Sequence, residues 1–172
     1  MQVTHDLAIG GLQRVVATIC RTIDRSAFDV QVLCLRALGP FAADVERLGI
    51  KVTLLPQTGR TDYASFLKVA RILRSEHIDV IHTHNTQPFV DGTLGALLAG
   101  VRTIVHTDHA RDFPDRRRYM LAEHIMSHLA YRVVGVSDDT CENLARFERI
   151  ARRKLKTIHN GLERYRGSGS FY

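Results

Sequence analysis

The spacing of apolar residues along the chain constrains the fold most strongly. Short runs rich in β-branched residues, such as 79–83 (DVIHT), 102–107 (RTIVHT) and 132–137 (RVVGVS), alternate with longer segments whose apolar residues recur every three or four positions. The short runs are typical of buried strands, and the longer segments are typical of amphipathic helices. Strands that alternate with helices connect through right-handed crossovers, which predicts a parallel sheet with helices packed against it.

This pattern divides the chain into alternating strands and helices. We expect strands at residues 1–4, 28–35, 51–55, 79–83, 102–107 and 132–137, with a candidate seventh at 156–159. We expect helices around 12–23, 41–48, 66–73, 88–99 and 116–130, and a sixth that carries Leu144 and Phe147 and is capped by Asp138 or Asp139. The predicted fold is therefore α/β: a Rossmann-like, doubly wound parallel sheet of about six or seven strands with helices on both faces.

One domain accounts for most of the chain. Its 172 residues, 45% hydrophobic and 24% charged, are typical of a single globular domain. No apolar run approaches the roughly 20 residues that cross a bilayer, and residues 1–6 show no secretory signal. The three cysteines lie far apart without CxxC spacing, so we expect reduced thiols and a cytoplasmic protein. Residues 164–172 contain GSGS and are interpreted as linker or added sequence, which leaves residues 1–163 as the domain.

The net charge of +6 indicates anionic partners, such as nucleotides, phospholipid surfaces or nucleic acid, although a solvated arginine-rich surface explains it equally well. Basic residues gather at 146–156 and at 111–118 (RDFPDRRR). The arginines of the second stretch begin a predicted helix, where they oppose the helix dipole and favour an acidic partner. In that helix Leu121, Ile125 and Leu129 form one stripe, which we expect to face the core rather than a membrane.

Ligands of doubly wound sheets bind outside the carboxyl ends of the strands, which directs attention to the residues that follow each strand. Gly10 and Gly11 follow the first strand and precede a helix. Glycine lets a phosphate approach the backbone, and a helix N-terminus offers free N–H groups. A tight turn that needs a positive φ explains the pair equally well. The chain has neither GxGxxG nor GxxxxGK, so a dinucleotide site and a Walker P-loop lack support.

Four histidines gather at the ends of the fourth and fifth strands. His82 and His84 flank Thr83 on the same side of their strand, and His106 and His109 belong to the next one. No cysteine or ExxH pattern accompanies them, so we expect no metal. We predict that His82 and His106 are hydrogen-bonded inside the sheet. His84 and His109 are predicted to reach solvent and to bind a phosphate or hydroxyl group.

Five segments resemble family 4 glycosyltransferases. Residues 10–16 (GGLQRVV) resemble the glycine loop that opens the family, 76–85 (EHIDVIHTHN) its fourth strand, and 102–110 (RTIVHTDHA) its fifth strand and loop. Residues 133–144 (VVGVSDDTCENL) and 158–163 (IHNGLE) resemble two later motifs of the same family. The five occur in family order and cover nearly the whole chain up to Glu163, so the combined resemblance is specific although each motif alone is weak.

The resemblance implies a retaining GT-B enzyme, in which two Rossmann-like domains face a cleft and no metal is needed. The N-terminal domain mainly binds the acceptor, and the C-terminal domain binds the nucleotide sugar, which is a substrate and not a cofactor. Carried onto this chain, Gly10 and Gly11 would lie against the donor diphosphate, and His109 would be the catalytic residue beside the donor sugar. The residues that would line the cleft are Gln13, His84, Asn85, Asp108, Arg111, Ser137, Asn160 and Gly161.

The chain also departs from the family pattern. Gln13 stands where Glu is more frequent, and no second Rossmann unit follows Glu163. We therefore expect the acceptor-side domain without its C-terminal donor domain, inactive alone, with a sugar or lipid-linked acceptor and a peripheral contact with the inner face of an anionic membrane. The alternative is a stand-alone, non-catalytic half-domain that pairs with or regulates a donor-domain partner. A GT-B epimerase matches the motifs less well, and nucleic-acid binding lacks its usual signatures.

Overall fold

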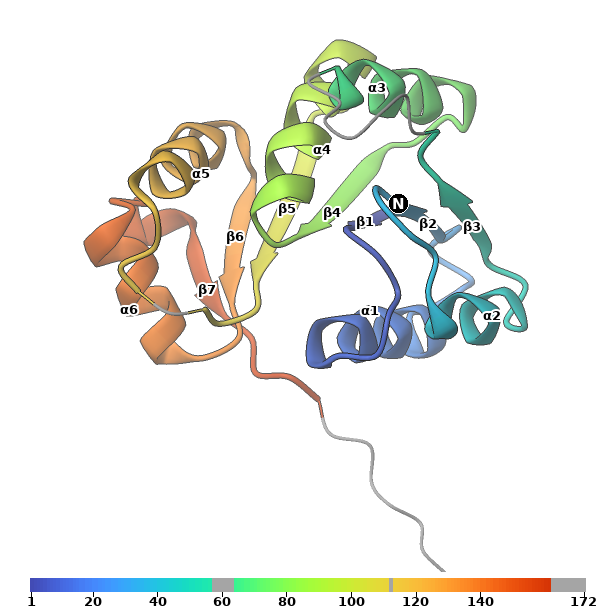
Figure 1. Cartoon of the computed structure of the whole chain (residues 1–172), viewed down its shortest axis with the longest axis horizontal. Helices are drawn as coiled ribbons and strands as arrows, with labels where there is room; N and C mark the ends of the chain where they lie inside the picture. Colours follow the sequence, from blue (N-terminus) through green and yellow to red (C-terminus); the bar gives the residue numbers. More distant parts are fainter. Residues whose placement is uncertain (57–63, 112, 162–172) are drawn as a thin grey trace, which may run out of the picture.

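A seven-stranded sheet forms the centre of the protein. The computed structural model describes residues 1–56, 64–111 and 113–161. Within them all neighbouring strands pair in parallel, in the order β3-β2-β1-β4-β5-β6-β7 (Figure 1). This confirms the predicted doubly wound sheet. The strands are β1 (Gln2–Thr4), β2 (Gln31–Cys34), β3 (Lys51–Leu54), β4 (Val80–His84), β5 (Thr103–Asp108), β6 (Arg132–Gly135) and β7 (Leu155–Thr157).

Helices cover both faces of the sheet. They are α1 (Gly11–Thr22), α2 (Pro40–Glu46), α3 (Ser65–Ser75), α4 (Thr86–Ala99), α5 (Arg117–Leu129) and α6 (Asp138–Phe147), followed by a 3₁₀ turn, η1 (Arg152–Lys154). The first two helices pack with β2 around one apolar cluster, which includes Val16, Val32 and Val45. The other four contribute to a larger cluster on the opposite face, which includes Phe89 and Leu144. This division follows from right-handed crossovers, because the chain reverses its direction of travel across the sheet at β4.

Glycines bring α4 close to the sheet and to α3. A Cβ atom on Gly92 would lie 2.7 Å from Thr83 Cγ2, and one on Gly95 would lie 2.7 Å from Val69 Cγ1. The helix ends at Gly100, which adopts the left-handed conformation with φ of 83° expected of a C-terminal glycine. This close packing fixes the N-terminus of α4 directly after β4.

Most predicted boundaries agree with the structure within two residues, but the start of β2 and the cap of α6 differ for a physical reason. β2 starts at Gln31 and not at residue 28, because Asp24–Phe28 form a turn in which Asp24 Oδ1 accepts hydrogen bonds from Ser26 N and Oγ. The N-terminal cap of α6 is Ser137, whose Oγ accepts a hydrogen bond from Thr140 N at 3.1 Å. The prediction of Asp138 or Asp139 as the cap was wrong, and both aspartates lie in the first helical turn instead.

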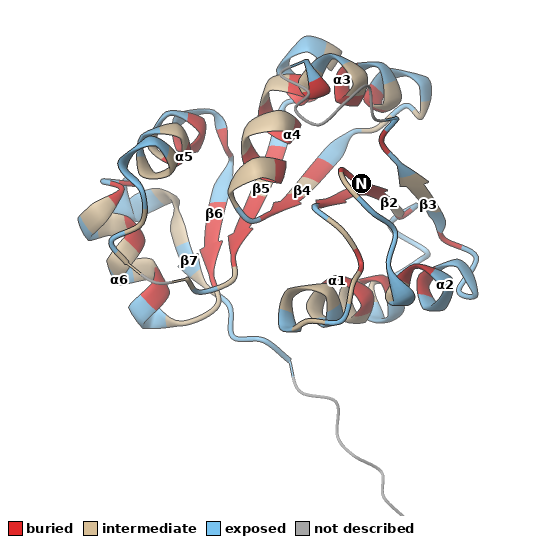
Figure 2. Cartoon of the chain, viewed as in Figure 1, coloured by how far each residue is buried: buried red, intermediate tan, exposed pale blue. Residues whose placement is uncertain are grey.

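The apolar stripe of α5 does not face the core. Leu121, Ile125 and Leu129 are 60%, 48% and 41% exposed, whereas Glu123 and Met126 are buried. Figure 2 accordingly shows both exposed and buried stretches along α5. The prediction of a core-facing stripe was wrong because α5 carries apolar residues on two sides, and an ion pair of Glu123 decides which side is buried. None of the described helices is both long enough and apolar enough to span a bilayer.

Candidate functional site

The strand order reverses between β1 and β4, and this switch point defines the candidate site. The register pairs Val3 with Thr83, His84 with Thr107, and Asp108 with Gly135, so the carboxyl ends of the central strands form one edge. Gly10 and Gly11 follow the first of these strands, Asn85 the second and His109 the third. These groups therefore occupy a single edge of the parallel sheet, where ligands of such folds bind.

The N-terminus of α1 is open to an anion. Gly10 is its cap, with φ of −179° and ψ of 167°. Among the residues that the structure describes, no side-chain hydrogen bond caps this end, and the first turn contains no acidic residue. Neither Gly10 nor Gly11 has a positive φ, so the explanation of the pair as a left-handed turn was wrong. The free N–H groups and the positive end of the helix dipole remain available to a phosphate group.

Gln13 shapes this turn. Its Nε2 donates to Asp6 Oδ1 at 2.8 Å, and Ala8 N donates to the same oxygen at 3.0 Å. Partial burial pushes the pKa of Asp6 upward, but the hydrogen bonds from Ala8, His5 and Gln13 outweigh it and hold that pKa below its usual value. A Cβ atom on Gly10 would lie 2.4 Å from Gln13 Oε1, so the glycine leaves room for this amide. A glutamate in place of Gln13 would face the Asp6 carboxylate.

The N-terminus of α4 is also uncapped. Asn85, its cap residue, has φ of 65° and ψ of 172°, a backbone region that is essentially restricted to glycine and costs about 1–3 kcal/mol. Its exposed side chain makes no capping hydrogen bond, and the first turn of α4 contains no acidic residue. By contrast, α6 supplies its own cap and first-turn aspartates. Two uncapped helix N-termini thus flank the switch point.

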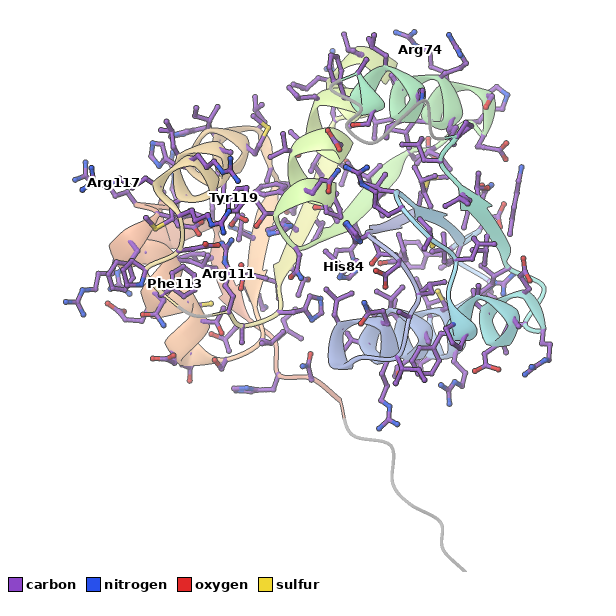
Figure 3. All side chains as sticks on the ribbon, viewed as in Figure 1. Arg74, His84, Arg111, Phe113, Arg117 and Tyr119 are labelled. Atoms are coloured by element: carbon purple, nitrogen blue, oxygen red, sulfur yellow. The ribbon has the colours of Figure 1, made fainter. Side chains whose placement is uncertain are left out.

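His84 is fully buried, contrary to the prediction that it reaches solvent. It lies on the central strand between β1 and β5 (Figure 3), and its ring contacts the rings of His82 and His109 at centroid distances of 4.3 and 5.2 Å. Its Nε2 is 2.8 Å from Gln2 Oε1, and its Nδ1 is 2.9 Å from His109 Nε2. His109 is partly exposed, so of the two predicted histidines only this one meets solvent.

These contacts fix the tautomers of both rings. Because the Gln2 oxygen accepts, His84 Nε2 carries the proton and His84 Nδ1 is the acceptor. His109 Nε2 must then donate to it, which leaves a lone pair on His109 Nδ1. Burial lowers the pKa of His109 to about 4 and that of His84 well below its usual value, so both rings are neutral near neutral pH. His109 can therefore accept a hydrogen bond from a ligand hydroxyl group.

The other two histidines make the predicted hydrogen bonds within the sheet, but only His106 is buried there. His106 is buried, stacks on Phe89 at 3.8 Å between ring centroids, and lies 3.0 Å from Thr83 Oγ1 through its Nδ1. His82 is half-buried, and its Nε2 lies 2.8 Å from Thr107 Oγ1. Desolvation lowers the pKa of His82 to about 4 and that of His106 well below its usual value.

Asp108 and Arg111 belong to a buried ion-pair network, the Arg111 cluster. Arg111 contacts the carboxylates of Asp108 at 3.1 Å and Asp115 at 3.2 Å, and those of Glu123 and Glu148. Asp108 is 1% exposed because it shares the inward face of β5 with His106. The resemblance predicts that both residues line the cleft, yet the Asp108 carboxylate pairs with Arg111, and Arg111 also pairs with Glu123 and Glu148 within the domain.

One guanidinium cannot neutralise four carboxylates, and the acidic groups respond. Desolvation and the charge of Glu123 raise the pKa of Glu148 to about 9, and desolvation raises that of Asp108 to about 6. The charges of the neighbouring carboxylates outweigh desolvation and raise the pKa of Arg111. Arg111 Nη1 also donates to Thr86 Oγ1 at 2.7 Å, so the cluster ties the loop after His109 to α4, α5 and α6.

Glu123 and Glu148 were not among the predicted site residues. Glu123 lies on the buried side of α5 and Glu148 directly follows α6, so an acidic residue at a position expected to face the core could have indicated them. His106, Asp108 and Glu123 each offer a possible metal ligand, and these atoms lie within 4.8 Å of one another. The Arg111 guanidinium already pairs with the two carboxylates of this group. We therefore describe it as part of the Arg111 cluster.

The remaining predicted residues occupy the same edge of the sheet. Ser137 caps α6, and its hydroxyl is engaged by Thr140 N and Oγ1. Asn160 and Gly161 are exposed after β7. Asp112 and Glu163 lie outside the described residues. The roles of these residues in ligand binding stay predictions.

A hollow of about 460 Å³ lies at the opposite, amino edge of the sheet. Its lining includes Met1, Phe28, Gln31, Glu76 and His82. It lacks an open helix N-terminus, and binding sites of doubly wound sheets lie at the carboxyl edge. We therefore place the candidate site at the switch point and not in this hollow.

Known proteins share both sequence and fold with this chain. A family model described as Glycosyltransferase Family 4 matches residues 9–166. Over 166 residues the chain is 24% identical to UDP-Gal:alpha-D-GlcNAc-diphosphoundecaprenol alpha-1,3-galactosyltransferase of Escherichia coli, covering 90% of this chain and 42% of the relative.

Two solved structures show the shared fold. The Anabaena protein Alr3699/HepE, in complex with UDP and glucose, has a TM-score of 0.73 at 18% identity, with 94% of this chain and 45% of that chain covered. UDP-GlcNAc 2-epimerase from Methanocaldococcus jannaschii has a TM-score of 0.63 at 15% identity, with 93% and 46% covered. The fold alone thus does not separate a transferase from an epimerase. The chain spans less than half the length of each of these relatives.

Proposed function

The chain belongs to Glycosyltransferase Family 4, and on that premise we propose that it forms the acceptor-side half of an enzyme that transfers a sugar from a nucleotide-sugar donor to an acceptor. The name of the Escherichia coli relative gives UDP-Gal and alpha-D-GlcNAc-diphosphoundecaprenol as its substrates. The Anabaena structure is a complex with UDP and glucose. A uridine-diphosphate sugar and a lipid-linked sugar acceptor are therefore the first substrates to test.

One observation carries the proposal: two uncapped helix N-termini and a neutral imidazole lie along one edge of the sheet at the switch point. Sugar transfer releases a nucleoside diphosphate on which negative charge develops, and oriented N–H groups stabilise that charge. In our proposal the N-terminus of α1 at Gly10 and Gly11 faces the donor diphosphate. No residue of this edge needs to change its protonation state for that contact.

His109 and Asn85 take complementary roles in this proposal. The lone pair on His109 Nδ1 accepts a hydrogen bond from a hydroxyl of the donor sugar and holds it in the reacting geometry. The buried His84 positions that ring by accepting from its Nε2, and Gln2 in turn fixes His84. The exposed Asn85 amide and the N-terminus of α4 contact the acceptor.

We further propose that the reaction needs no metal, since the open N-terminus of α1 supplies positive potential where a divalent cation would otherwise stand. A second Rossmann-like unit would supply the nucleotide site, so the chain alone would be inactive. If the gene ends near residue 163, the chain is instead a natural half-domain that pairs with or regulates a donor-domain partner. The coding sequence after that position separates these two cases.

A reconstitution assay tests the proposal. The chain is incubated with UDP-galactose or UDP-glucose and a polyprenyl-diphosphate-linked sugar, with and without a separately produced donor-binding domain, in the presence of EDTA. We expect transfer only when the donor-binding domain is added. His109→Asn should then reduce the transfer rate by about a hundredfold. The matched change His77→Asn, at the amino edge, should leave it unchanged. Robust transfer by the chain alone, or an unaffected His109 variant, would contradict the proposal.

A further inference from the structure

Within residues 1–56, 64–111 and 113–161, no side chain covers an apolar strip along α5. Leu121, Ile125 and Leu129 lie on one side of the helix, and Tyr131, just beyond its end, is 64% exposed. These aliphatic side chains, spaced four residues apart, do not pack in the core, because Glu123 and Met126 form the inward face of α5. We define the α5 surface as these four residues together with Arg117, Arg118 and Arg132.

The α5 surface is also purely cationic. Residues 116–132 contain four arginines and one acidic residue, Glu123, which is 0% exposed and paired with Arg111. Arg117 points away from the domain (Figure 3), and Arg132 stacks on Tyr131 with its guanidinium 5.4 Å from the ring centroid. Arginines in the first turn oppose the helix dipole, so an anionic partner at this end relieves an unfavourable interaction.

A hollow continues the α5 surface toward α6. It has a volume of about 360 Å³, and its lining includes Met120, Leu121 and Phe147 as well as Arg117 and Arg149. Glu148 also lines it, with its pKa raised to about 9 by burial and the Glu123 charge. Apolar side chains with two guanidinium groups nearby suit a lipid headgroup phosphate and the start of its acyl chain. The hollow thus extends the same combination of apolar and cationic groups.

The dimensions of the strip favour a bilayer over a protein partner. Eight residues separate Leu121 from Leu129, so the strip is only about 12 Å long and one side chain wide. A stable protein interface buries roughly 800 Å² on each partner, which a single file of three aliphatic side chains does not provide. Helices that lie in a bilayer interface insert apolar side chains of one face, with basic residues beside them and tyrosine at the level of the headgroups, which is the arrangement of the α5 surface.

We propose that the α5 surface docks on an anionic phospholipid bilayer. Leu121, Ile125 and Leu129 insert below the headgroups, while the arginines contact lipid phosphates. The biological role of this docking rests on the proposed function. Because α5 begins near the carboxyl edge of the sheet, docking would hold the candidate site close to a lipid-linked acceptor. The lipid contact itself does not depend on sugar transfer.

Vesicle co-sedimentation tests the docking with the chain itself. Vesicles of phosphatidylcholine alone are compared with vesicles of equal parts phosphatidylcholine and phosphatidylglycerol, at low and high salt. We expect binding to the anionic vesicles that weakens with salt, and little binding to the neutral ones. The double change Leu121→Gln with Ile125→Gln, and separately Arg117→Gln with Arg118→Gln, should each weaken binding by about tenfold or more.

Leu67→Gln is the matched control, because Leu67 is 52% exposed on α3 and outside the α5 surface. It should bind vesicles like the unchanged chain, and circular dichroism should show that every variant keeps its helix content. Equal binding to neutral and anionic vesicles, no effect of either double change, or an equal effect of Leu67→Gln would overturn the proposal. So would a concentration-dependent dimer that the leucine change abolishes, because a second copy would then occupy the strip.

The vesicle assay contains neither donor nor acceptor, so its outcome is independent of catalysis. Loss of sugar transfer in the reconstituted system with vesicle binding intact would contradict the proposed function alone. Intact transfer to a short, soluble acceptor without vesicle binding would contradict the docking alone.

Discussion

Glu148 is the buried group whose replacement makes the sharpest stability prediction. It ends the α6 segment, is 2% exposed, and accepts a hydrogen bond from Arg111. Desolvation and the Glu123 charge raise its pKa to about 9. In the folded chain it therefore holds a proton that the unfolded chain has already lost near neutral pH. Glu148→Gln keeps the size and the hydrogen-bond acceptor but removes this titration.

The magnitude follows from the proton balance. A carboxyl group whose folded pKa lies above its unfolded value loses stability as the pH rises between the two values. From about pH 6 to pH 8, below the folded pKa of about 9, each unit costs about 1.4 kcal/mol. The total is about 2–3 kcal/mol, which corresponds to roughly 5–10 °C in Tm for a domain of this size.

Thermal unfolding followed by circular dichroism at several pH values measures this effect. The difference in stability between Glu148→Gln and the unchanged chain should grow by about 2–3 kcal/mol in favour of the variant from about pH 6 to pH 8. The N-terminal amine, whose pKa burial lowers to about 6, also titrates in this range, but equally in both proteins. Glu142→Gln, an exposed change on the same helix, should show a constant difference. Parallel curves for Glu148→Gln and the unchanged chain would refute the buried, protonated carboxyl group.

Two further changes test the anchoring of the site. Arg111→Met should lower the free energy of unfolding in urea by about 3–5 kcal/mol, because it leaves buried carboxylates without their cation. The exposed control Arg118→Met should change it by less than about 0.5 kcal/mol. Equal effects of the two changes would contradict the ion pairing described for the Arg111 cluster. Gly10→Ala should cost about 1 kcal/mol, because its Cβ would displace Gln13 from Asp6. Gly11→Ala meets no atom within 4 Å and should cost nothing, so a greater loss there would argue against this packing.

The sequence predicted the architecture because periodicity and strand-end position are local properties. Short β-branched runs marked the seven strands, and the parallel arrangement then placed Gly10, Asn85 and His109 at one edge. The prediction for His84 was wrong because exposure depends on neighbours, here Gln2 and His109, that sequence spacing does not bring together.

The Arg111 cluster shows the same limit of sequence reasoning. The sequence shows Arg111 only as the first residue of a basic stretch, yet its side chain pairs with carboxylates up to 37 positions away. The direction of α5 followed from this contact, because both sides of the helix carry apolar residues and only the buried Glu123 distinguishes them. Long-range ion pairs of this kind leave no periodic signal in the sequence.

In our proposal, donor and acceptor meet at the carboxyl edge of the sheet, where the chain passes from β1 into α1 and from β4 into α4. An NMR titration of the ¹⁵N-labelled chain with UDP-glucose measures this directly, even when binding is weak. We expect concentration-dependent shifts at the amides of Gly11, Asn85 and His109. Shifts confined to the amino-edge hollow, around Gln31 and His82, would contradict it.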